Sequence, residues 1–336
     1  MTGAPFISVV IPTFNRNDKL LECLGSLEVQ SYPHTDFEVI VVDDGSSDGT
    51  QAMVESFAAR SQMRVCCLQQ AHAGPSAARN AGAAKAAGAI IAFTEDDVVP
   101  ESRWLECAAR YFQDPATAAM EGRTRSMNAA SVRSFESPGT HGFLPCNLFV
   151  RRDSFFALGG YDPAYCDLSL NLYFREDADF GFRLLEHGCG VVFGSDVVVS
   201  HPEQFPAPRD VFRHARRYVF DPLLYRNHPA LYRAYIEVKQ LGALTMHRPF
   251  HHLCWFYLAS FIVILTEIFS GHHEYLPTCL IIMLAIHMGI RFRYERKAVP
   301  SFWNVPATLT FAVLPFYYLA WFVRGCLRFG SWGALL

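Results

Sequence analysis

Short apolar runs alternate with helix-like segments through the first part of this chain, and this alternation constrains the fold more than any other feature. The runs are rich in Val, Ile and Phe, have the length of buried strands, and span 6–11, 37–42, 64–68 and 89–93. Between them lie segments such as 76–87, which is rich in alanine and bounded by Pro75 and Gly88. This alternation predicts an α/β fold with a parallel, doubly wound sheet.

Clusters of acidic residues follow two of these runs. Asp43 and Asp44 come directly after the second run, and Glu95, Asp96 and Asp97 follow the fourth after a threonine. The carboxyl ends of strands in an open α/β sheet are where ligands bind. Because adjacent carboxylates repel one another, the second cluster favours a hard divalent cation with oxygen ligands. A solvated acidic turn is the alternative.

Two other groups suit a bound nucleotide. Asp44 precedes a glycine turn, where its carboxylate can accept hydrogen bonds from a ribose hydroxyl or a base N–H, or can stabilise the turn itself. Arg79 lies among small residues, from which its guanidinium can reach a diphosphate; a surface arginine is the alternative. The sequence contains neither glycine-rich phosphate-loop motif, so a nucleotide bound here would rely on the metal for its phosphates.

Five blocks of the chain, taken in order, resemble the family 2 glycosyltransferases of the GT-A fold. The blocks are 8–16 (Ser-Val-Val-Ile-Pro-Thr-Phe-Asn-Arg), 41–50 (Val-Val-Asp-Asp-Gly-Ser-Ser-Asp-Gly-Thr), 78–82 (Ala-Arg-Asn-Ala-Gly), 95–97 (Glu-Asp-Asp) and 176–177 (Glu-Asp). The resemblance covers about residues 6–201. It implies a Rossmann-like, mostly parallel sheet flanked by helices, and inverting transfer of a sugar from a nucleotide sugar, most simply a UDP-sugar.

The resemblance also implies roles for the residues of the donor side. It places Asp44 at the nucleotide base and Pro12, Thr13 and Asn15 along the nucleoside. Arg79 remains the candidate for the diphosphate. These residues form the predicted substrate-binding set together with Asp96 and Glu176, which are described next.

A metal site is implied by the acidic block and one histidine. The resemblance implies that Asp97 ligates Mn²⁺ or Mg²⁺ and that Asp96 bonds the ribose or the sugar. Glu95 replaces the commoner aspartate of the family and is expected to be only a neighbour. His201 stands where related enzymes often place a third metal ligand, although a structural histidine is the alternative. The cation would bridge the diphosphate oxygens and stabilise the charge on the leaving group.

Asp177 is the candidate catalytic base. An inverting displacement needs a carboxylate to take the proton of the attacking hydroxyl, and Glu176-Asp177 resembles the catalytic block of the family. Both acids also begin a helix, where the dipole favours negative charge, so capping is the alternative. The segment 146–162 resembles the acceptor side, and the irregular segment 123–141 is expected to order over bound donor. The Gln-x-x-Arg-Trp block of processive members is absent, which favours transfer of a single sugar.

The chain changes character beyond about residue 240. Charged residues make up 18% of the whole sequence and hydrophobic residues 51%, and the apolar excess is concentrated in this last part. The apolar segments span about 253–270, 275–290 and 305–323. Their length and their flanking Trp and Tyr residues predict membrane helices, with a buried helical bundle as the alternative. A basic run at 213–218 can lie on anionic headgroups as an interfacial helix; a solvated helix face is the alternative.

We therefore expect a glycosyltransferase domain at 1–240 and a membrane-associated helical region at 241–336. Within the first, the nucleotide-sugar half is expected at about 1–100, the acceptor half at about 101–205 and interfacial helices at about 206–240.

Basic residues suggest the orientation of the membrane segments. The loop 291–297 is strongly basic and should be cytoplasmic, which puts the N-terminal domain on the same side across the first two segments. Arg324 and Arg328 would then lie outside if the third segment crossed the bilayer. Either this segment is a hairpin or in-plane element broken at Pro315, or the rule does not hold here.

Charge and cysteine content exclude several classes of protein. The formal net charge of −3 gives no sign of a nucleic-acid partner, and the ten cysteines contain no Cys-x-x-Cys pair. The N-terminus has no features of a secretory signal, so we expect the catalytic domain in the cytoplasm.

The predicted function is transfer of one sugar to a lipid-linked saccharide or growing glycan at the cytoplasmic membrane face, as in polysaccharide biosynthesis. Partners would be the donor, the acceptor and membrane lipids. The alternatives are a metal-dependent nucleotidyltransferase, which would not need Asp177, and a non-catalytic sugar-nucleotide-binding subunit of a membrane synthase.

Overall fold

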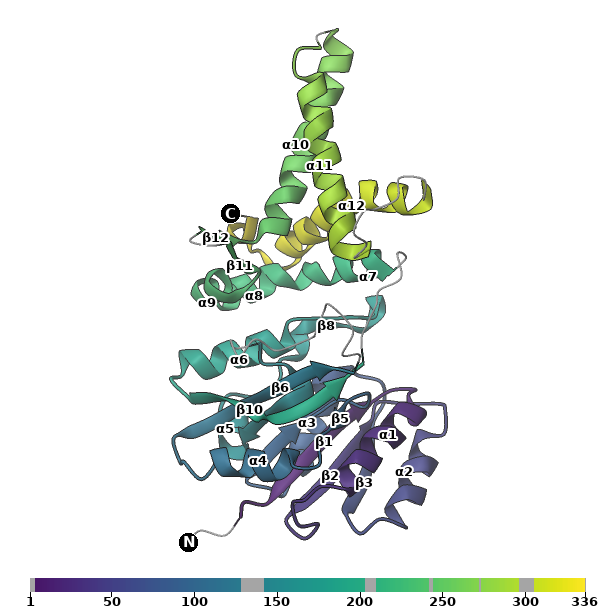
Figure 1. The fold of residues 1–336 in the computed structure, drawn as a ribbon, viewed down its shortest axis with the longest axis vertical. Coiled ribbons are helices and arrows are strands. Elements are labelled where there is room, and N and C mark those ends of the chain that lie inside the picture. Colours follow the sequence, from purple (N-terminus) through teal and green to yellow (C-terminus); the bar gives the residue numbers. More distant parts are fainter. Residues whose placement is uncertain are drawn as a thin grey trace. The chain divides into compact units, whose positions relative to one another are not determined.

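The chain forms two compact units, 1–204 and 205–336, in a computed structural model (Figure 1). The structure describes residues 4–127, 142–202, 210–241, 244–271, 273–295 and 305–335. The second unit includes three short helices, 210–217, 221–227 and 229–235. They lie in the segment 206–240, which the sequence predicts to be part of the first domain.

Unit 1 is built on an eight-stranded mixed sheet with the order β3-β2-β1-β4-β7-β6-β10-β5. The strands are β1 (Ile7–Thr13), β2 (Phe37–Asp43), β3 (Arg64–Gln69), β4 (Ile90–Phe93), β5 (Val99–Pro100), β6 (Thr117–Ser126), β7 (Leu148–Arg151) and β10 (Gly190–His201). Strand β7 runs antiparallel to β4 and β6, and β5 runs antiparallel to β10; the remaining pairs are parallel. The sheet is therefore mostly parallel, with one antiparallel strand inserted near its middle.

Helices cover both faces of this sheet. They are α1 (Asn17–Glu28), α2 (Thr50–Ala58), α3 (Pro75–Lys85), α4 (Trp104–Tyr111), α5 (Arg152–Ala157) and α6 (Glu176–Glu186). Alternate residues of the central strands, such as Val9 and Val39, share one core with Leu24 of α1 and Trp104 of α4. On the other face α3 packs closely on β1, because Gly82 leaves room for the strand below it. The two buried faces explain why the strands read as continuous apolar runs.

A second, smaller sheet and an aromatic cluster complete unit 1. The small sheet pairs β8 (Cys166–Asp167) with β9 (Leu172–Tyr173). Phe155 of α5 and Tyr161 pack on Phe93 of β4, and Phe180 of α6 packs on both of them. This cluster joins α5 and α6 to the end of β4, where the acidic block begins.

Strand β10 carries an irregularity in its pairing with β6. Gly194 pairs with Gly122 and Val198 pairs with Arg123, so residues 195–197 have no partners on β6. Asn147 fixes this point: its Nδ2 donates to the carbonyls of Arg123 and Val197, and its Oδ1 accepts from Trp104. The segment 123–141 is expected from the sequence to be irregular, but its first residues, 123–126, belong to β6. Residues 128–141 lie outside the described part of the chain, and so does most of the segment expected to close over the donor.

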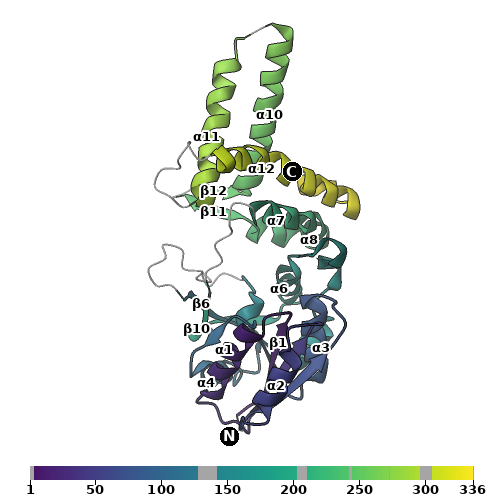
Figure 2. The ribbon, with the colours of Figure 1, turned by 90° about the vertical axis from the view of Figure 1, so that its right-hand side faces the viewer.

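Unit 2 contains helices and one short hairpin of strands. The elements are α7 (Asp210–Arg217), α8 (Asp221–Asn227), α9 (Pro229–Tyr235), β11 (Val238–Leu241), β12 (Leu244–His247), α10 (Pro249–Ser270), α11 (Leu276–Glu295) and α12 (Val305–Phe329). By length and composition two helices could span a membrane, 249–270 and 308–329, and 276–291 is a shorter apolar helix, counting only residues that the structure describes. Figure 2 shows α10 and α11 side by side as an antiparallel hairpin.

Candidate functional site

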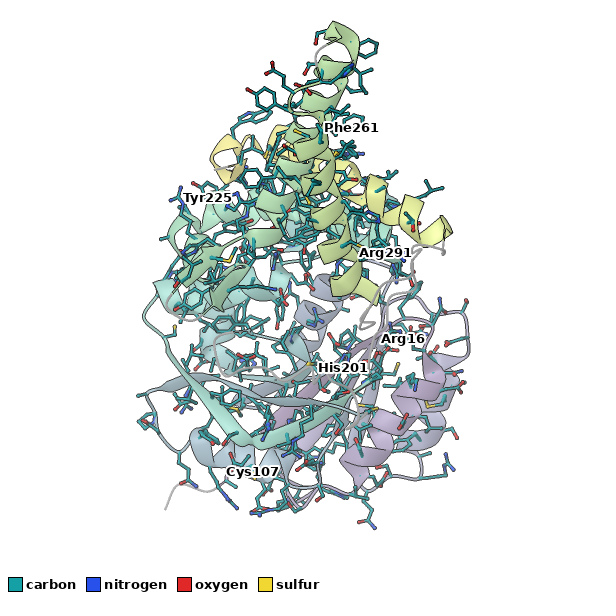
Figure 3. All side chains as sticks on the ribbon, turned by 45° about the horizontal axis from the view of Figure 1, so that its top comes forward. Arg16, Cys107, His201, Tyr225, Phe261 and Arg291 are labelled. Atoms are coloured by element: carbon teal, nitrogen blue, oxygen red, sulfur yellow. The ribbon has the colours of Figure 1, made fainter. Side chains whose placement is uncertain are left out.

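The predicted donor-side residues meet at one edge of the large sheet. Thr13 ends β1, Asp44 follows β2, the acidic block follows β4, and His201 ends β10. These four strands run in the same direction, so their carboxyl ends lie at one edge of the sheet. Arg16 and His201 are labelled at this edge in Figure 3. Pro12 is half-buried within β1, opposite Val42 of β2.

Asp44 is engaged by four donors from one loop. Its Oδ1 accepts from Gln70 Nε2 at 2.6 Å and from the Ala73 N–H at 2.8 Å. Its Oδ2 accepts from the Gly74 N–H at 2.9 Å and lies 2.8 Å from His72 Nδ1. A carboxylate has about four lone-pair positions, so this one is saturated. Asp44 therefore holds the loop 70–74 in place.

Asn15 and Phe14 form the rim beside this loop. Asn15 adopts the left-handed conformation at φ +53°, and its Oδ1 accepts from the Ser47 N–H at 2.8 Å. This conformation lets the turn after β1 interlock with the turn after β2. Phe14 stacks on His72, with ring centroids 4.3 Å apart. This aromatic pair could not be predicted from the sequence, because nothing in the chain order links residue 14 to residue 72.

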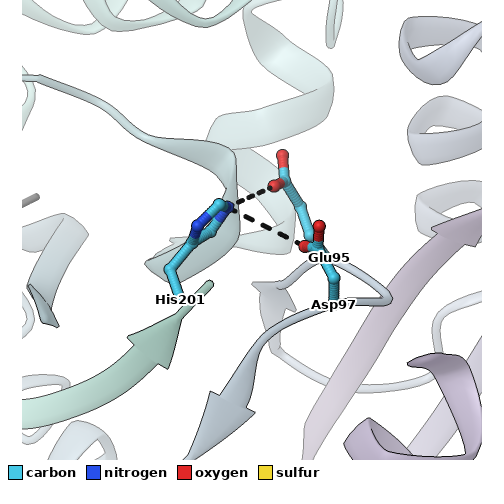
Figure 4. A group of neighbouring side chains, drawn as sticks. All are labelled: Glu95, Asp97 and His201. Atoms are coloured by element: carbon cyan, nitrogen blue, oxygen red, sulfur yellow. Dashed lines mark ion pairs between the residues drawn. The ribbon is translucent and has the colours of Figure 1, made fainter. Parts of the chain in front are cut away.

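Glu95, Asp97 and His201 form a candidate cation site (Figure 4). One ligand atom from each lies within 4.8 Å of the others, and His201 Nε2 is 3.5 Å from Glu95 and 3.8 Å from Asp97. Burial acts to lower the pKa of His201, but the two carboxylates outweigh it and raise that pKa. Burial likewise acts to raise the pKa of Glu95, while His201 and Arg79 lower it overall.

The chemistry of this group fits a divalent metal. Asp97 Oδ1 is buried and accepts no hydrogen bond from any residue that the structure describes. His201 Nδ1 lies 2.7 Å from the Pro202 carbonyl, which can only accept, so Nδ1 carries the proton and Nε2 faces the acids. Two carboxylates and one imidazole suit Mn²⁺. Glu95, expected to be only a neighbour, is thus a member of the group.

Asp96 points to a different set of partners. It accepts from Thr13 Oγ1 at 2.9 Å and from Arg16 Nη1 at 3.1 Å. Burial raises the pKa of Asp96 to about 6, and the charge of Asp97 adds to this, although Arg16 and Thr13 act in the opposite direction. Arg16 also contacts Asp97 at 3.1 Å, so one exposed cation spans both acids.

Arg79 joins the acidic block to the start of α6. This arginine is 3% exposed; its Nη2 lies 3.2 Å from Glu95 and its Nη1 lies 3.2 Å from Glu176. Its guanidinium also lies 5.4 Å from the centre of the Tyr161 ring. Burial acts to lower the pKa of Arg79, but Glu176, Tyr161 and Glu95 raise it. Both ends of the guanidinium, expected to meet a diphosphate, are used by carboxylates here.

Asp177 lies beside Glu176 in the first turn of α6, as the sequence predicts. Arg175 precedes the helix in the left-handed conformation at φ +76°, and the Asp177 carboxylate accepts from the Ala178 N–H at 2.7 Å. Asp177 is half-buried, whereas Glu176 is buried. The bridge through Arg79 therefore ties the helix start that carries Asp177 to the strand end that carries the candidate cation site.

Comparison with known proteins identifies a family model and several relatives. Residues 8–155 match the model described as "Glycosyl transferase family 2". Glycosyltransferase AglE of Haloferax volcanii is 28% identical over 211 residues, which are 59% of this chain and 67% of AglE. The poly(ribitol-phosphate) beta-N-acetylglucosaminyltransferase TarS of Staphylococcus aureus is 31% identical over 125 residues, which are 37% of this chain and 22% of TarS. The chain thus spans two thirds of the first relative and less than a quarter of the second.

A solved structure supports the fold over nearly the whole chain. The mannosyltransferase PcManGT from Pyrobaculum calidifontis, solved in complex with GDP-Man and Mn²⁺, covers 98% of this chain and 86% of its own, with a TM-score of 0.51 and 18% identity. The expected α/β fold with a mostly parallel sheet and C-terminal apolar helices is confirmed.

Proposed function

We propose that this chain, which belongs to glycosyltransferase family 2 and has the GT-A fold, transfers one sugar from a nucleotide-sugar donor with inversion at the anomeric carbon. The donor is most simply a UDP-sugar, and the acceptor is a hydroxyl of a lipid-linked saccharide or growing glycan. The observation that carries this proposal is the bridge Glu95–Arg79–Glu176. It connects the candidate cation site to the start of α6, where the candidate base lies.

The transfer is a single displacement. The acceptor oxygen attacks the anomeric carbon while the bond from that carbon to the diphosphate oxygen breaks, and the electron pair leaves with the nucleoside diphosphate. Asp177 takes the proton of the acceptor hydroxyl, so it must face the side of the sugar opposite the leaving group. Glu176 cannot exchange roles with Asp177, because Arg79 holds its carboxylate in a buried ion pair.

Asp97 and His201, with Glu95 beside them, would hold Mn²⁺ or Mg²⁺. When bound, such a cation would supply positive charge to the diphosphate as it leaves. The Mn²⁺ named for PcManGT supports this assignment, and so does the buried, undonated Oδ1 of Asp97. Asp96 would bond the ribose or the sugar.

The nucleoside would lie over the turns after β1 and β2. Pro12, Thr13 and Asn15 form one wall, and Asp44 acts from the other side through the loop 70–74 that it holds. Arg79 would reach a diphosphate only by giving up one of its carboxylate partners.

The apolar helices of unit 2 support a place at the membrane. We propose that the protein is membrane-attached with its catalytic unit on the cytoplasmic side. A lipid-linked acceptor would then reach the enzyme from the bilayer to which it is confined.

Donor turnover by the full chain in detergent with Mn²⁺ tests the reaction. We expect release of nucleoside diphosphate and sugar transfer to acceptor, or slow hydrolysis without it. Release of pyrophosphate would indicate a nucleotidyltransferase instead, and donor binding without turnover would indicate a non-catalytic subunit.

Asp177→Asn tests the base. The variant should bind donor as the wild type does but lose at least about a hundredfold in turnover, the usual contribution of a general base. Glu186→Gln, at the exposed end of the same helix, is the matched control and should keep full activity. An active Asp177→Asn would remove this residue from the mechanism.

A further inference from the structure

The hairpin of α10 and α11 exposes large apolar side chains on its outer surface. Phe269 is 85% exposed, and the other strongly exposed members include Phe256, Ile262, Ile268, Leu280 and Ile281. A continuous apolar surface of this kind is unfavourable in water and marks a surface that meets another apolar phase. Figure 3 shows Phe261 part-way along this hairpin and Arg291 near its base.

The acid within α10, Glu267, is already hydrogen-bonded inside the hairpin. Glu267 is 7% exposed, and both of its carboxylate oxygens lie 3.0 Å from the Tyr275 N–H, beside the first turn of α11. The positive end of the α11 dipole also favours this carboxylate. No other Asp, Glu, Lys or Arg occurs in 249–290 except Glu274 at the tip, so little opposes entry into hydrocarbon.

The hairpin has the length of one bilayer crossing and return. The apolar stretch Leu253–Phe269 is about 25 Å long at the helical rise, and a hydrocarbon core is about 30 Å thick. The tip carries His273, Glu274 and the exposed Tyr275, which suit a headgroup region.

Helix α12 does not continue this bundle but lies across the base of the hairpin (Figures 1 and 2). Its Thr308 accepts from Arg291, at the base of α11, at 2.9 Å. Farther along, Tyr318 lies 3.1 Å from His251, in the first turn of α10. Farther still, Gly325 of α12 lies against the backbone of Val219.

Arginine residues on α12 and α7 oppose entry of α12 into the hydrocarbon and favour a position at the base of the α10–α11 hairpin. Arg216 of α7 and Arg324 of α12 lie over the same Trp321 ring, at 5.1 and 4.7 Å. Were α12 to cross the bilayer, it would draw Arg216 and the exposed Arg213 of α7 into hydrocarbon with it, which is strongly unfavourable. An arginine–tryptophan–arginine stack instead suits a membrane interface.

We propose that the α10–α11 hairpin inserts into the lipid bilayer while α12 lies in the plane of its surface, so that the chain on either side of unit 2's hairpin stays on one side of the membrane. This inference rests on the proposed membrane attachment and resolves the orientation that the basic residues leave open. With α12 in the plane, Arg324 and Arg328 lie on the same side as the catalytic unit, as the distribution of basic residues requires.

Cysteine labelling of the full chain tests this arrangement. In a background with the partly exposed Cys66, Cys67, Cys166 and Cys189 changed to serine, single cysteines replace Lys19 in unit 1, His273 at the hairpin tip and Trp332 after α12. Each variant is treated with a membrane-impermeant maleimide in right-side-out and in inside-out vesicles. Labelling after detergent solubilisation is the control for thiol access.

We expect Lys19→Cys and Trp332→Cys to react from the same side, and His273→Cys to react from the opposite side or only after detergent. Reaction of Trp332→Cys from the side opposite Lys19→Cys would mean that α12 crosses the bilayer and would overturn the proposal. Reaction of all three from one side would mean that the hairpin is not inserted and would overturn it as well. Sidedness is read without turnover, so a protein with no transferase activity can still give the expected pattern.

Discussion

Replacing Arg79 by methionine should destabilise unit 1 strongly, because this arginine neutralises two carboxylates away from water. Arg79 is 3% exposed and Glu176 is 6% exposed, whereas the Glu95 side chain keeps 30% exposure. Methionine fills similar volume, so the loss is mainly electrostatic. The variant removes the arginine partner of the buried Glu176 carboxylate.

The expected magnitude follows from these exposures. Removing one partner of a buried ion pair costs about 3–5 kcal/mol, and the more exposed Glu95 adds little to it. In a unit of about 200 residues 1 kcal/mol shifts the melting temperature by about 2–4 °C, so we expect a decrease of about 10 °C. Adding Glu176→Gln to Arg79→Met should recover much of the lost stability, because the buried carboxylate charge of residue 176 is then removed.

Pulsed hydrogen exchange during thermal unfolding of the full chain measures this decrease in melting temperature. It is followed on peptides from α3 and α6 so that unit 2 does not contribute. Arg16→Met is the matched control: its side chain is 48% exposed, and its ion pairs should contribute about 1 kcal/mol or less. Should Arg79→Met unfold like the wild type and only weaken donor binding, the arginine would serve the diphosphate and the bridge would carry no stability.

Three further predictions concern the site and the sheet. Mn²⁺ alone should raise the melting temperature of the wild-type chain, since ligand binding to the native state adds about 2.7 kcal/mol at a hundred times Kd; Asp97→Asn and His201→Ala should abolish the shift, and an unchanged shift would place the metal elsewhere. Asp44→Asn should cost about 1–3 kcal/mol of unfolding free energy even without donor, because an amide cannot accept from all four donors; unaltered unfolding would mean that this residue serves only the ligand. Gly82→Ala should destabilise by about 1–3 kcal/mol in urea unfolding, because the new methyl would lie 2.4 Å from a Val10 methyl, whereas Gly25→Ala on α1, with open space around it, should be neutral or stabilising.

The sequence predicts the nucleotide-side sheet well, because its strands form continuous apolar runs between helix-like segments. The runs expected at 37–42 and 64–68 match β2 and β3 to within a residue, and the helix starting at Glu176 is found where the acids predict it. The long β6 is harder, since its pairing with β7 and β10 depends on contacts between segments far apart in the chain.

Individual roles are less predictable than positions. Glu95 looks like a neighbour in the sequence, yet it contacts both Arg79 and His201, which come from other elements. Asp44 has the residue type and turn of a ligand-facing acid, yet the loop 70–74 saturates it. In each case the sequence shows which type of side chain is present, whereas tertiary packing determines which residues that side chain contacts.

The irregular part of β10 beside Asn147 affects the candidate cation site, because the number of residues in it determines which side chain β10 presents there. Side chains on a strand alternate between its two faces, so inserting or removing an odd number of residues moves all later side chains to the other face. Residues 195–197 add an odd number to β10 before His201. If the strand stayed continuous from Gly194 onward, loss of one of them would turn His201 toward the opposite side of the sheet, away from Asp97 and Glu95. We therefore expect point changes at this spot to disturb the candidate cation site less than insertions or deletions do.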